Sequence, residues 1–164
     1  MPVTMIPQQE SNWCWAAVTV TVNALFSPGS TLMQCDVAKP VLVSETQIKG
    51  AVDCCANPEQ CNIPAYLQDA LSWAGNLSLA EHGYLDFVGV TTEIDAGRPI
   101  GVRIQWSDGG GHFILIDGYR EFSSGVPQVH VADPYYGPSY LFYSDLVNAY
   151  QDNGIWTDTY FVQP

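Results

Sequence analysis

The sequence predicts an α+β fold, in which a helical half at the start of the chain packs on an antiparallel β-sheet formed by the rest. Apolar residues recur at helical spacing in the first half, and short apolar or alternating segments follow. Links of hairpin length join these later segments, which favours antiparallel pairing. With 164 residues, the chain fits one domain. We expect a single domain over residues 1–164, with a helical lobe at about 12–76 and a β-sheet lobe at about 77–164.

Start and stop signals bound four expected helices in the first lobe. The first runs from Cys14 to about Phe26, with Asn12 as its N-cap and Ser27-Pro28-Gly29 as its end. The second covers residues 30–38, with Ser30 as its cap and Pro40 as its stop. The third runs from residue 44 to about residue 54 and is opened by the capping box Ser44-Glu45-Thr46-Gln47. The fourth covers residues 62–74, with Asn62 as its cap and Pro64 in its first turn.

The second lobe reads as short strands with little helix. The expected strands cover residues 77–79, 84–90, 100–106, 113–119, 128–132 and 157–162. A helical turn at 92–96 and a helix at 143–150 lie among them. A turn near Ser123-Ser124-Gly125 joins the strands at 113–119 and 128–132, so we expect these two strands to pair as a hairpin.

Charge is scarce and strongly acidic, with five Lys plus Arg against seventeen Asp plus Glu and a net charge of -12. This balance argues against nucleic acid as a partner, because phosphate neutralisation needs clustered Lys or Arg. It argues against an anionic membrane surface for the same reason. No apolar run approaches the ~20 residues of a membrane helix. Residues 1–5 lack the basic start and apolar block of a signal peptide.

Five cysteines divide into a cluster of four and one that stands apart. The cluster is Cys35, Cys54, Cys55 and Cys61, and its spacing favours two disulfides over a zinc site. Adjacent cysteines rarely bond each other, so Cys35 pairs with one of the adjacent two and Cys61 with the other; the order stays open. Disulfides imply an oxidising compartment, so we expect a secreted or periplasmic protein whose targeting segment is absent from this chain. Cys14 remains as the free thiol.

Cys14 is the candidate nucleophile. It begins a helical pattern, and a helix N-terminus stabilises a thiolate through free N–H groups and the helix dipole. The alternative for a lone cysteine is a buried, inert thiol. Gln8 precedes it in an extended segment, from which its amide could donate to an oxyanion. Gln9 could replace Gln8 if the chain bends one residue later, and both could equally be ordinary surface glutamines.

His112 is the candidate base, because it follows three glycines and begins an apolar strand. In the expected hairpin, the end of the second strand lies beside the start of the first, which brings Asp133 next to His112 within a residue or two of register. Asp117 is the rival carboxylate, but it lies roughly 16 Å along the strand from His112. We expect Asp117 to lie opposite His130 instead.

Aromatic and glycine residues near these groups have simpler interpretations. Trp13, Trp15 and Trp106 are expected as core or cleft-wall side chains. Glycine lets a backbone approach a substrate closely. Among these residues, we assign Trp13, Trp15, Gly110 and Gly111 as candidates for substrate binding.

The combination of Gln8, Cys14-Trp15-Ala16 and the later histidine resembles the papain-like cysteine peptidases. The bacterial branch is the more similar one, with staphopains, plant-pathogen effector proteases and double-glycine leader peptidases. The segments Gly111-His112-Phe113-Ile114 and Val131-Ala132-Asp133-Pro134 look like its His and Asp motifs. The resemblance implies Cys14 as nucleophile, His112 as general base and acid, Asp133 as orienting residue and Gln8 as oxyanion donor. Plant enzymes have Asn in place of Asp133, and cytosolic effectors lack the cysteine cluster.

These residues together predict a cysteine endopeptidase that works through a thioester acyl-enzyme. The same triad could serve a transglutaminase, a peptide ligase or a deamidase, and the fold without its chemistry could serve as a silent peptide-binding module. We expect a monomer that acts on a peptide or protein substrate. We expect no cofactor, no metal, no nucleic-acid partner and no membrane partner.

Overall fold

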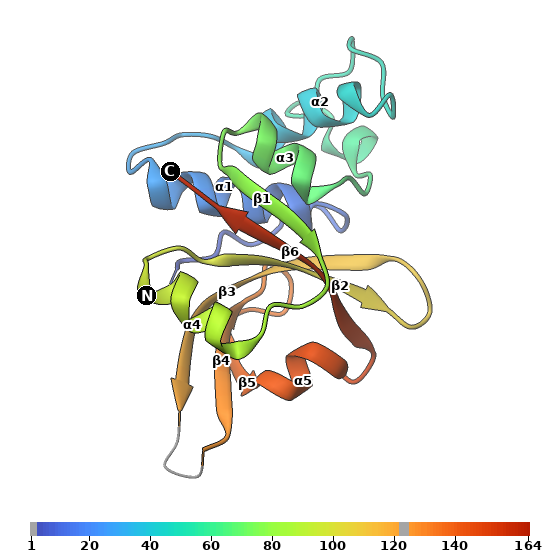
Figure 1. Ribbon diagram of the computed structural model, residues 1–164. Helices are drawn as coiled ribbons and strands as arrows, with labels where there is room; N and C mark the ends of the chain where they lie inside the picture. Colours follow the sequence, from blue (N-terminus) through green and yellow to red (C-terminus); the bar gives the residue numbers. More distant parts are fainter. Residues whose placement is uncertain (1–2, 122–124) are drawn as a thin grey trace.

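A computed structural model describes residues 3–121 and 125–164 of the chain. A six-stranded antiparallel sheet forms the middle layer, with three helices on one face and two on the other (Figure 1). The first face carries α1 (Cys14–Phe26), α2 (Gln34–Ser44) and α3 (Leu67–Trp73); the second carries α4 (Phe87–Asp95) and α5 (Tyr143–Asn148). The α+β fold with its helical first half is therefore confirmed.

The strand order in the sheet is β1-β6-β2-β3-β4-β5. The strands are β1 (Leu77–His82), β2 (Ile100–Trp106), β3 (Gly111–Glu121), β4 (Pro127–Ala132), β5 (Ser139–Phe142) and β6 (Gly154–Val162). Side chains alternate between two cores, because neighbours along a strand point to opposite faces. Phe113 and Leu115 pack with the α1 side, while Ile114 and Ile116 pack with the α4 and α5 side.

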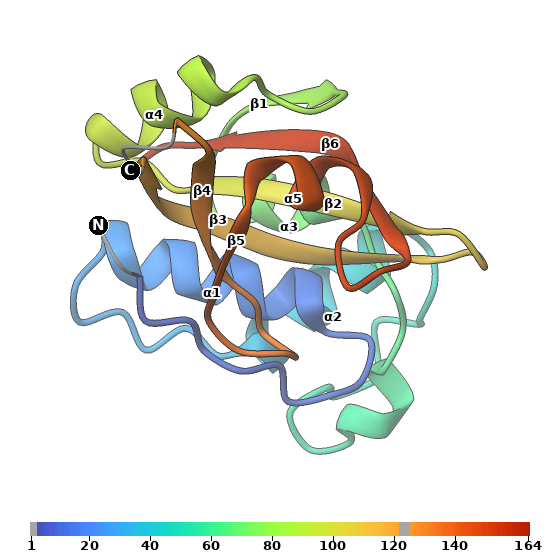
Figure 2. The same ribbon diagram turned by 90° about the horizontal axis from the view of Figure 1, so that it is seen from below.

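Helix α1 begins and ends at the predicted residues and is buried along its first nine positions. It contacts β3 of the sheet and packs against α2 and α3, and Figure 2 shows this helix from below. Two threonines are buried in it, and Thr19 satisfies its hydroxyl by donating to the carbonyl of Trp15 at 2.8 Å. Burial therefore stabilises a helix whose threonines and valines have low helix propensity.

The two predicted asparagine caps are wrong, for one reason. Trp13 precedes α1 and Tyr66 precedes α3, neither with a side-chain cap. Asn12 and Asn62 instead bond each other across the helical layer, through Asn12 N–H to Asn62 Oδ1 at 2.8 Å and Asn12 Nδ2 to the Asn62 carbonyl at 3.0 Å. A tertiary contact has replaced two local ones.

The second and third predicted helices are also corrected. Helix α2 starts at Gln34, is preceded by Met33 rather than Ser30, and continues through Pro40 to Ser44. A proline inside a helix costs about 3 kcal/mol, but α2 buries Val37, Ala38, Val41 and Leu42 completely or nearly so. The segment 44–47 therefore ends a helix instead of opening one, and the next helical element is a short 3-10 helix, η1 (Pro58–Cys61), beyond the expected end of the third helix.

In the second lobe, the main errors concern residues 84–90 and 139–142. Residues 87–95 form α4, whose N-cap Asp86 accepts a hydrogen bond from Gly89 N–H at 2.7 Å. The strand predicted at residues 84–90 is therefore wrong, because the Asp86 cap starts a helix there. Strand β5 was not predicted. Ser123 and Ser124 of the predicted hairpin turn lie outside the described residues, while β3 and β4 pair as expected.

The clustered cysteines form two disulfides, Cys35–Cys55 and Cys54–Cys61. The adjacent pair is thus shared between two bridges, and the order that the sequence left open is settled. Cys14 is the free cysteine. Disulfides of this kind fit an oxidising compartment. Within residues 3–121 and 125–164, no helix has both the length and the apolar character needed to cross a membrane.

Removing the Cys35–Cys55 bridge is expected to cost more stability than removing Cys54–Cys61. The bridges close loops with sequence separations of 20 and 7 residues. Loop-closure entropy gives about 3 and about 2 kcal/mol respectively. Denaturant unfolding of Cys35→Ser/Cys55→Ser and of Cys54→Ser/Cys61→Ser measures both. A larger loss for the shorter loop would contradict this explanation.

Candidate active site

Cys14 is the first residue of α1, and its side chain reaches a pocket between the helical layer and the sheet. The pocket has a volume of about 350 Å³ and includes residues from the segment before α1, the loop before α3, and the ends of β2 and β3. Because α1 starts at Cys14, the first N–H groups of the helix have no preceding turn to supply acceptors. The thiol therefore sits at the positive end of the helix dipole.

His112 lies at the start of β3 and faces Cys14. Its Nε2 is 2.9 Å from Asp133 Oδ2, and Cys14 lines the same pocket and interacts electrostatically with the ring, which leaves Nδ1 for the sulfur. The β3–β4 register pairs Leu115 with Ala132, so Asp133 comes immediately after the paired residues, close to the start of β3. The hairpin thus places the carboxylate beside the imidazole, and α1 supplies the thiol from the other side of the pocket.

Asp133 is buried and accepts four hydrogen bonds. Besides His112, the N–H groups of Tyr135 and Tyr136 donate to its Oδ1 at 2.6 and 2.8 Å, and the hydroxyl of Tyr150 donates to its Oδ2 at 2.7 Å. These donors hold the carboxylate in one orientation and stabilise its negative charge. The contribution of Tyr150 was not foreseen, because it follows α5 and nothing in its sequence neighbourhood relates it to Asp133.

Aromatic rings enclose the imidazole. Trp106 stacks on His112 with centroids 6.1 Å apart, and it also stacks on Tyr150 at 6.3 Å. Tyr136 meets His112 edge-on at 6.1 Å. Trp106 was expected as a core or cleft-wall aromatic, and it lines the pocket. The rings limit water around the His112–Asp133 pair, which strengthens the electrostatic interaction between them.

The pKa values follow from burial and from this network. Burial of His112 opposes the charged imidazolium, but the hydrogen bonds to Asp133 and Cys14, and the charges of both, outweigh it and raise the pKa of His112 to about 9. Burial likewise opposes ionisation of Asp133, yet its hydrogen bond to His112, the charge of that ring and the donors from Tyr136 and Tyr150 lower its pKa. Burial and the charge of Asp133 raise the pKa of Tyr150.

The segment that carries Gln8 is fixed from two directions. Gln34, which is buried in α2, accepts from the N–H of Gln9 at 2.9 Å and donates to the carbonyl of Pro7 at 2.8 Å. The N–H of Gln8 donates to the carbonyl of Pro134 at 3.0 Å, which ties the segment to the residue after Asp133. Gln34 was missed because no local pattern distinguishes it.

The amide group of Gln8 lines the pocket beside Cys14. Its Nε2 donates to the carbonyls of Glu10 and Ser11 at 2.9 and 2.8 Å, and its Oε1 is buried with no hydrogen-bond partner among the described residues. Gln9, the alternative, has an exposed side chain. Of the two glutamines, Gln8 is therefore the one that lies at the site, with both amide hydrogens bonded locally.

The four residues assigned to substrate binding have different positions. Gly110 and Gly111 line the pocket, and Gly110 has a φ of 77°, which favours glycine. A Cβ at Gly111 would come within 2.9 Å of the Ile104 carbonyl. Trp15 borders the pocket but is fully buried. Trp13 is 1% exposed and donates its indole N–H to the carbonyl of Cys61 at 2.7 Å, so the assignment of Trp13 to substrate binding is corrected to a core position.

A second His–Asp pair lies away from this pocket. His130 Nδ1 is 2.5 Å from Asp117 Oδ1, and Asp117 also accepts from the N–H of Val3 at 2.6 Å. Asp117 lies at the bulge itself, between Ile116 and Gly118, where β3 shifts its register against β4. This rival carboxylate therefore holds the N-terminal segment and His130 and is not bonded to His112.

This arrangement is that of the papain-like cysteine peptidases. It consists of a thiol on a helix N-terminus, an imidazole and an orienting side chain, set between helices and an antiparallel sheet. A family model described as the Peptidase_C39 like family matches residues 1–162, nearly the whole chain. The chain therefore belongs to this family and is a cysteine peptidase. No curated protein matches the chain.

Proposed function

We propose that the protein is an endopeptidase that cleaves peptide bonds by acyl transfer to Cys14. The observation that carries the proposal is that Cys14 and His112 line the same open pocket while His112 bonds the buried Asp133 at 2.9 Å. In this proposal the proton of the thiol already resides on Nδ1 of His112 before the substrate reacts, in line with the raised pKa of that ring, and the sulfur attacks the substrate carbonyl as a thiolate. The imidazolium then gives the proton to the leaving amine, and a thioester remains on Cys14.

The second half of the reaction returns the enzyme to its starting state. His112 takes a proton from water, the resulting hydroxide attacks the thioester, and the carboxylic acid product leaves as the sulfur recovers a proton. Asp133 keeps Nδ1 directed at the sulfur, because it holds Nε2 at 2.9 Å, and it stabilises the charged imidazolium. Trp106 and Tyr136 keep water away from the ion pair.

The oxyanion of the tetrahedral intermediate needs hydrogen-bond donors. We assign the backbone N–H of Cys14 and the side chain of Gln8 to this role. In the free protein Gln8 Nε2 donates to two local carbonyls, so one of these bonds must be exchanged for a bond to the substrate oxygen. A neutral hydrogen bond contributes only about 1 kcal/mol net, and catalytic hydrogen bonds often align only when substrate binds.

A peptide-library cleavage profile tests the proposed function. Wild type is expected to hydrolyse internal peptide bonds, and the products are expected to carry the mass of one added water. The same assay with an added primary amine distinguishes hydrolysis from transfer. Amine-adduct products, or a single mass unit gained at a glutamine side chain, would replace the peptidase with a transferase or a deamidase. Intact peptides in both conditions would contradict all three activities.

The alkaline side of the pH profile is expected to report on His112. Its pKa of about 9 keeps the imidazolium present through neutral pH. Activity that needs this proton is complete well below pH 9 and falls above it, by about tenfold for each further pH unit. Measuring kcat/KM against pH with one peptide substrate checks this. A profile that stays flat well above pH 9 would show that His112 is not the proton donor.

We also propose that the protein acts as a single catalytic domain, as a monomer, in an oxidising compartment outside the cytoplasm. The two disulfides support the compartment. The placement of Gln8, Cys14, His112 and Asp133 from both halves of the chain supports the single domain, because neither half holds the site alone.

A further inference from the structure

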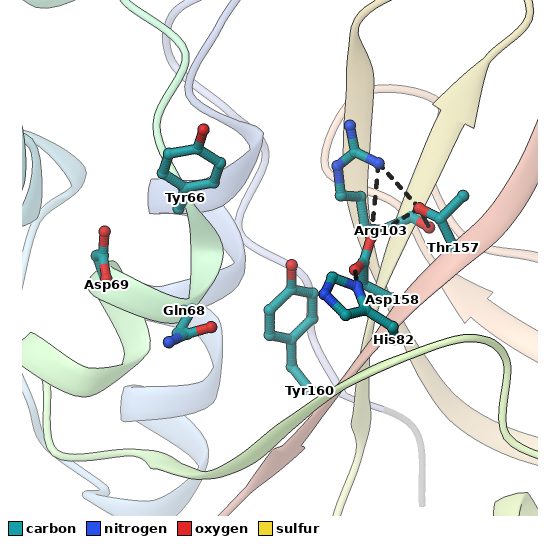
Figure 3. A pocket seen from close by; sticks show the side chains of 8 residues that line it. All are labelled: Tyr66, Gln68, Asp69, His82, Arg103, Thr157, Asp158 and Tyr160. Atoms are coloured by element: carbon teal, nitrogen blue, oxygen red, sulfur yellow. Dashed lines mark hydrogen bonds and ion pairs between the residues drawn. The ribbon is translucent and has the colours of Figure 1, made fainter.

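A second cavity, of about 590 Å³, lies between α3 and the sheet, away from Cys14. Figure 3 shows Tyr66 and Asp69 on the side of α3, and Arg103, Asp158 and His82 on the side of the sheet. Tyr160 lies between the two sides in the same view. This cavity is larger than the one of about 350 Å³ at Cys14 and has no role in the proposed chemical steps.

A third cavity, of about 250 Å³, borders both of the others. The connecting cavity shares Pro64, Ala65, Gly110, Gly111 and Phe113 with the pocket at Cys14. It shares Tyr66 and Arg103 with the large cavity. Three neighbouring cavities therefore lie in a row along the boundary between helices and sheet, beginning at Cys14.

The strand register gives the length of this row of cavities. Phe113, next to His112, pairs with Arg103; Arg103 pairs with Asp158; and Asp158 pairs with His82. Directly paired residues point to the same face, so the four side chains form one row across β3, β2, β6 and β1. Three strand spacings amount to about 14 Å, which an extended peptide spans with about four residues.

Charge pairing within the cavity leaves one carboxylate unbalanced. Arg103 Nη1 is 3.5 Å from Asp158 Oδ2, and its Nη2 donates to Gln105 Oε1 at 2.6 Å. His82 Nδ1 is 2.5 Å from Asp158 Oδ1. For Asp69, by contrast, the described part of the chain offers no ion-pair partner within 4.0 Å.

The pKa of Tyr160 depends on the charges around the cavity. Its pKa is raised to about 12, first by burial and then by the charge of Asp158, with a further contribution from Asp69; only Arg103 opposes them. Two carboxylates and one guanidinium therefore act on Tyr160, in a chain with a net charge of -12. Tyr66, which is 67% exposed, offers a ring face to the aliphatic stem and cationic head of a long side chain, while Tyr160 lines the cavity and is 6% exposed.

We propose that this cavity binds a lysine or arginine side chain of the substrate, about four residues from the scissile bond, and that Asp69 selects it. The proposal rests on the proposed peptidase function, since the substrate chain must lie across Cys14. The exposed ring of Tyr66 holds the stem, and the carboxylate of Asp69 faces the cation.

Synthetic peptides that carry one lysine, moved one position at a time through a cleavable sequence, test the proposal against norleucine peptides of the same length. In wild type, lysine at one position is expected to raise kcat/KM by about fivefold, mainly through a lower KM. Asp69→Asn should abolish this gain. The matched control Asp145→Asn removes the same charge from the exposed first turn of α5, and it should keep the gain.

Two results would overturn the subsite while the peptidase stands: no position at which lysine exceeds norleucine, or an undiminished gain in Asp69→Asn. If wild type cleaves no peptide, the proposed function fails separately, and fluorescence anisotropy with the labelled lysine and norleucine peptides then decides on the cavity. Lysine-selective binding that is lost in Asp69→Asn supports it, and equal binding of both peptides contradicts it.

Discussion

Replacing Cys14 with alanine is expected to lower kcat/KM by about 10⁵-fold or more, since the loss of a nucleophile removes the whole covalent route. The other four cysteines are held in disulfides, so the described part of the chain offers no second thiol. Steady-state cleavage of a peptide chosen from the library profile measures the loss.

The Cys14→Ala protein is expected to remain folded, because the change removes a single sulfur atom at the edge of an open pocket. Its denaturant unfolding should lie within about 1–2 kcal/mol of wild type, and it should still bind the peptide. Retention of a tenth of the wild-type activity by this folded variant would rule out the thiol as nucleophile.

The second large effect is expected from His112→Ala, which should lower kcat/KM by about 10⁵-fold, because base and nucleophile act as one unit. His130→Ala is the matched control. Each histidine holds a buried aspartate, at 2.9 Å for His112 and 2.5 Å for His130. Only His112 lines the pocket that holds Cys14.

The control separates the role of a catalytic imidazole from the role of a buried ion pair. His130→Ala is expected to lower the free energy of unfolding, because the buried Asp117 loses its hydrogen bond to His130 and keeps only the one from Val3 N–H. Its kcat/KM should stay within about tenfold of wild type. If kcat/KM fell equally in His112→Ala and His130→Ala, the effect of His112→Ala would come from lost stability, and the catalytic role of His112 would be wrong.

The site could be inferred from sequence where local order and strand pairing determine it. Cys14 starts a helix because the apolar pattern begins there, and Asp133 reaches His112 because a hairpin sets the register. The same hairpin excluded Asp117. These inferences succeed because a strand advances a fixed distance per residue, so that separation along the chain converts into separation in space.

Residues that act through tertiary contacts were beyond the reach of the sequence. Tyr150 bonds Asp133 from the end of α5, and Gln34 clamps the segment of Gln8 from α2. No sequence pattern links Tyr150 to Asp133 or Gln34 to the segment of Gln8. The failed caps have the same origin, because Asn12 and Asn62 satisfy each other. Pro40 lies inside α2 because the buried face of that helix outweighs the local cost.

The most direct test of the central claim is the mass of the enzyme trapped during turnover. Acid quenching of wild type with a slowly hydrolysed peptide ester should yield a protein heavier by the acyl fragment, and peptide mapping without reduction should place it on Cys14. Hydroxylamine should release it, as expected of a thioester. A protein that turns over substrate with no adduct, or with an adduct on another residue, would contradict the proposed mechanism.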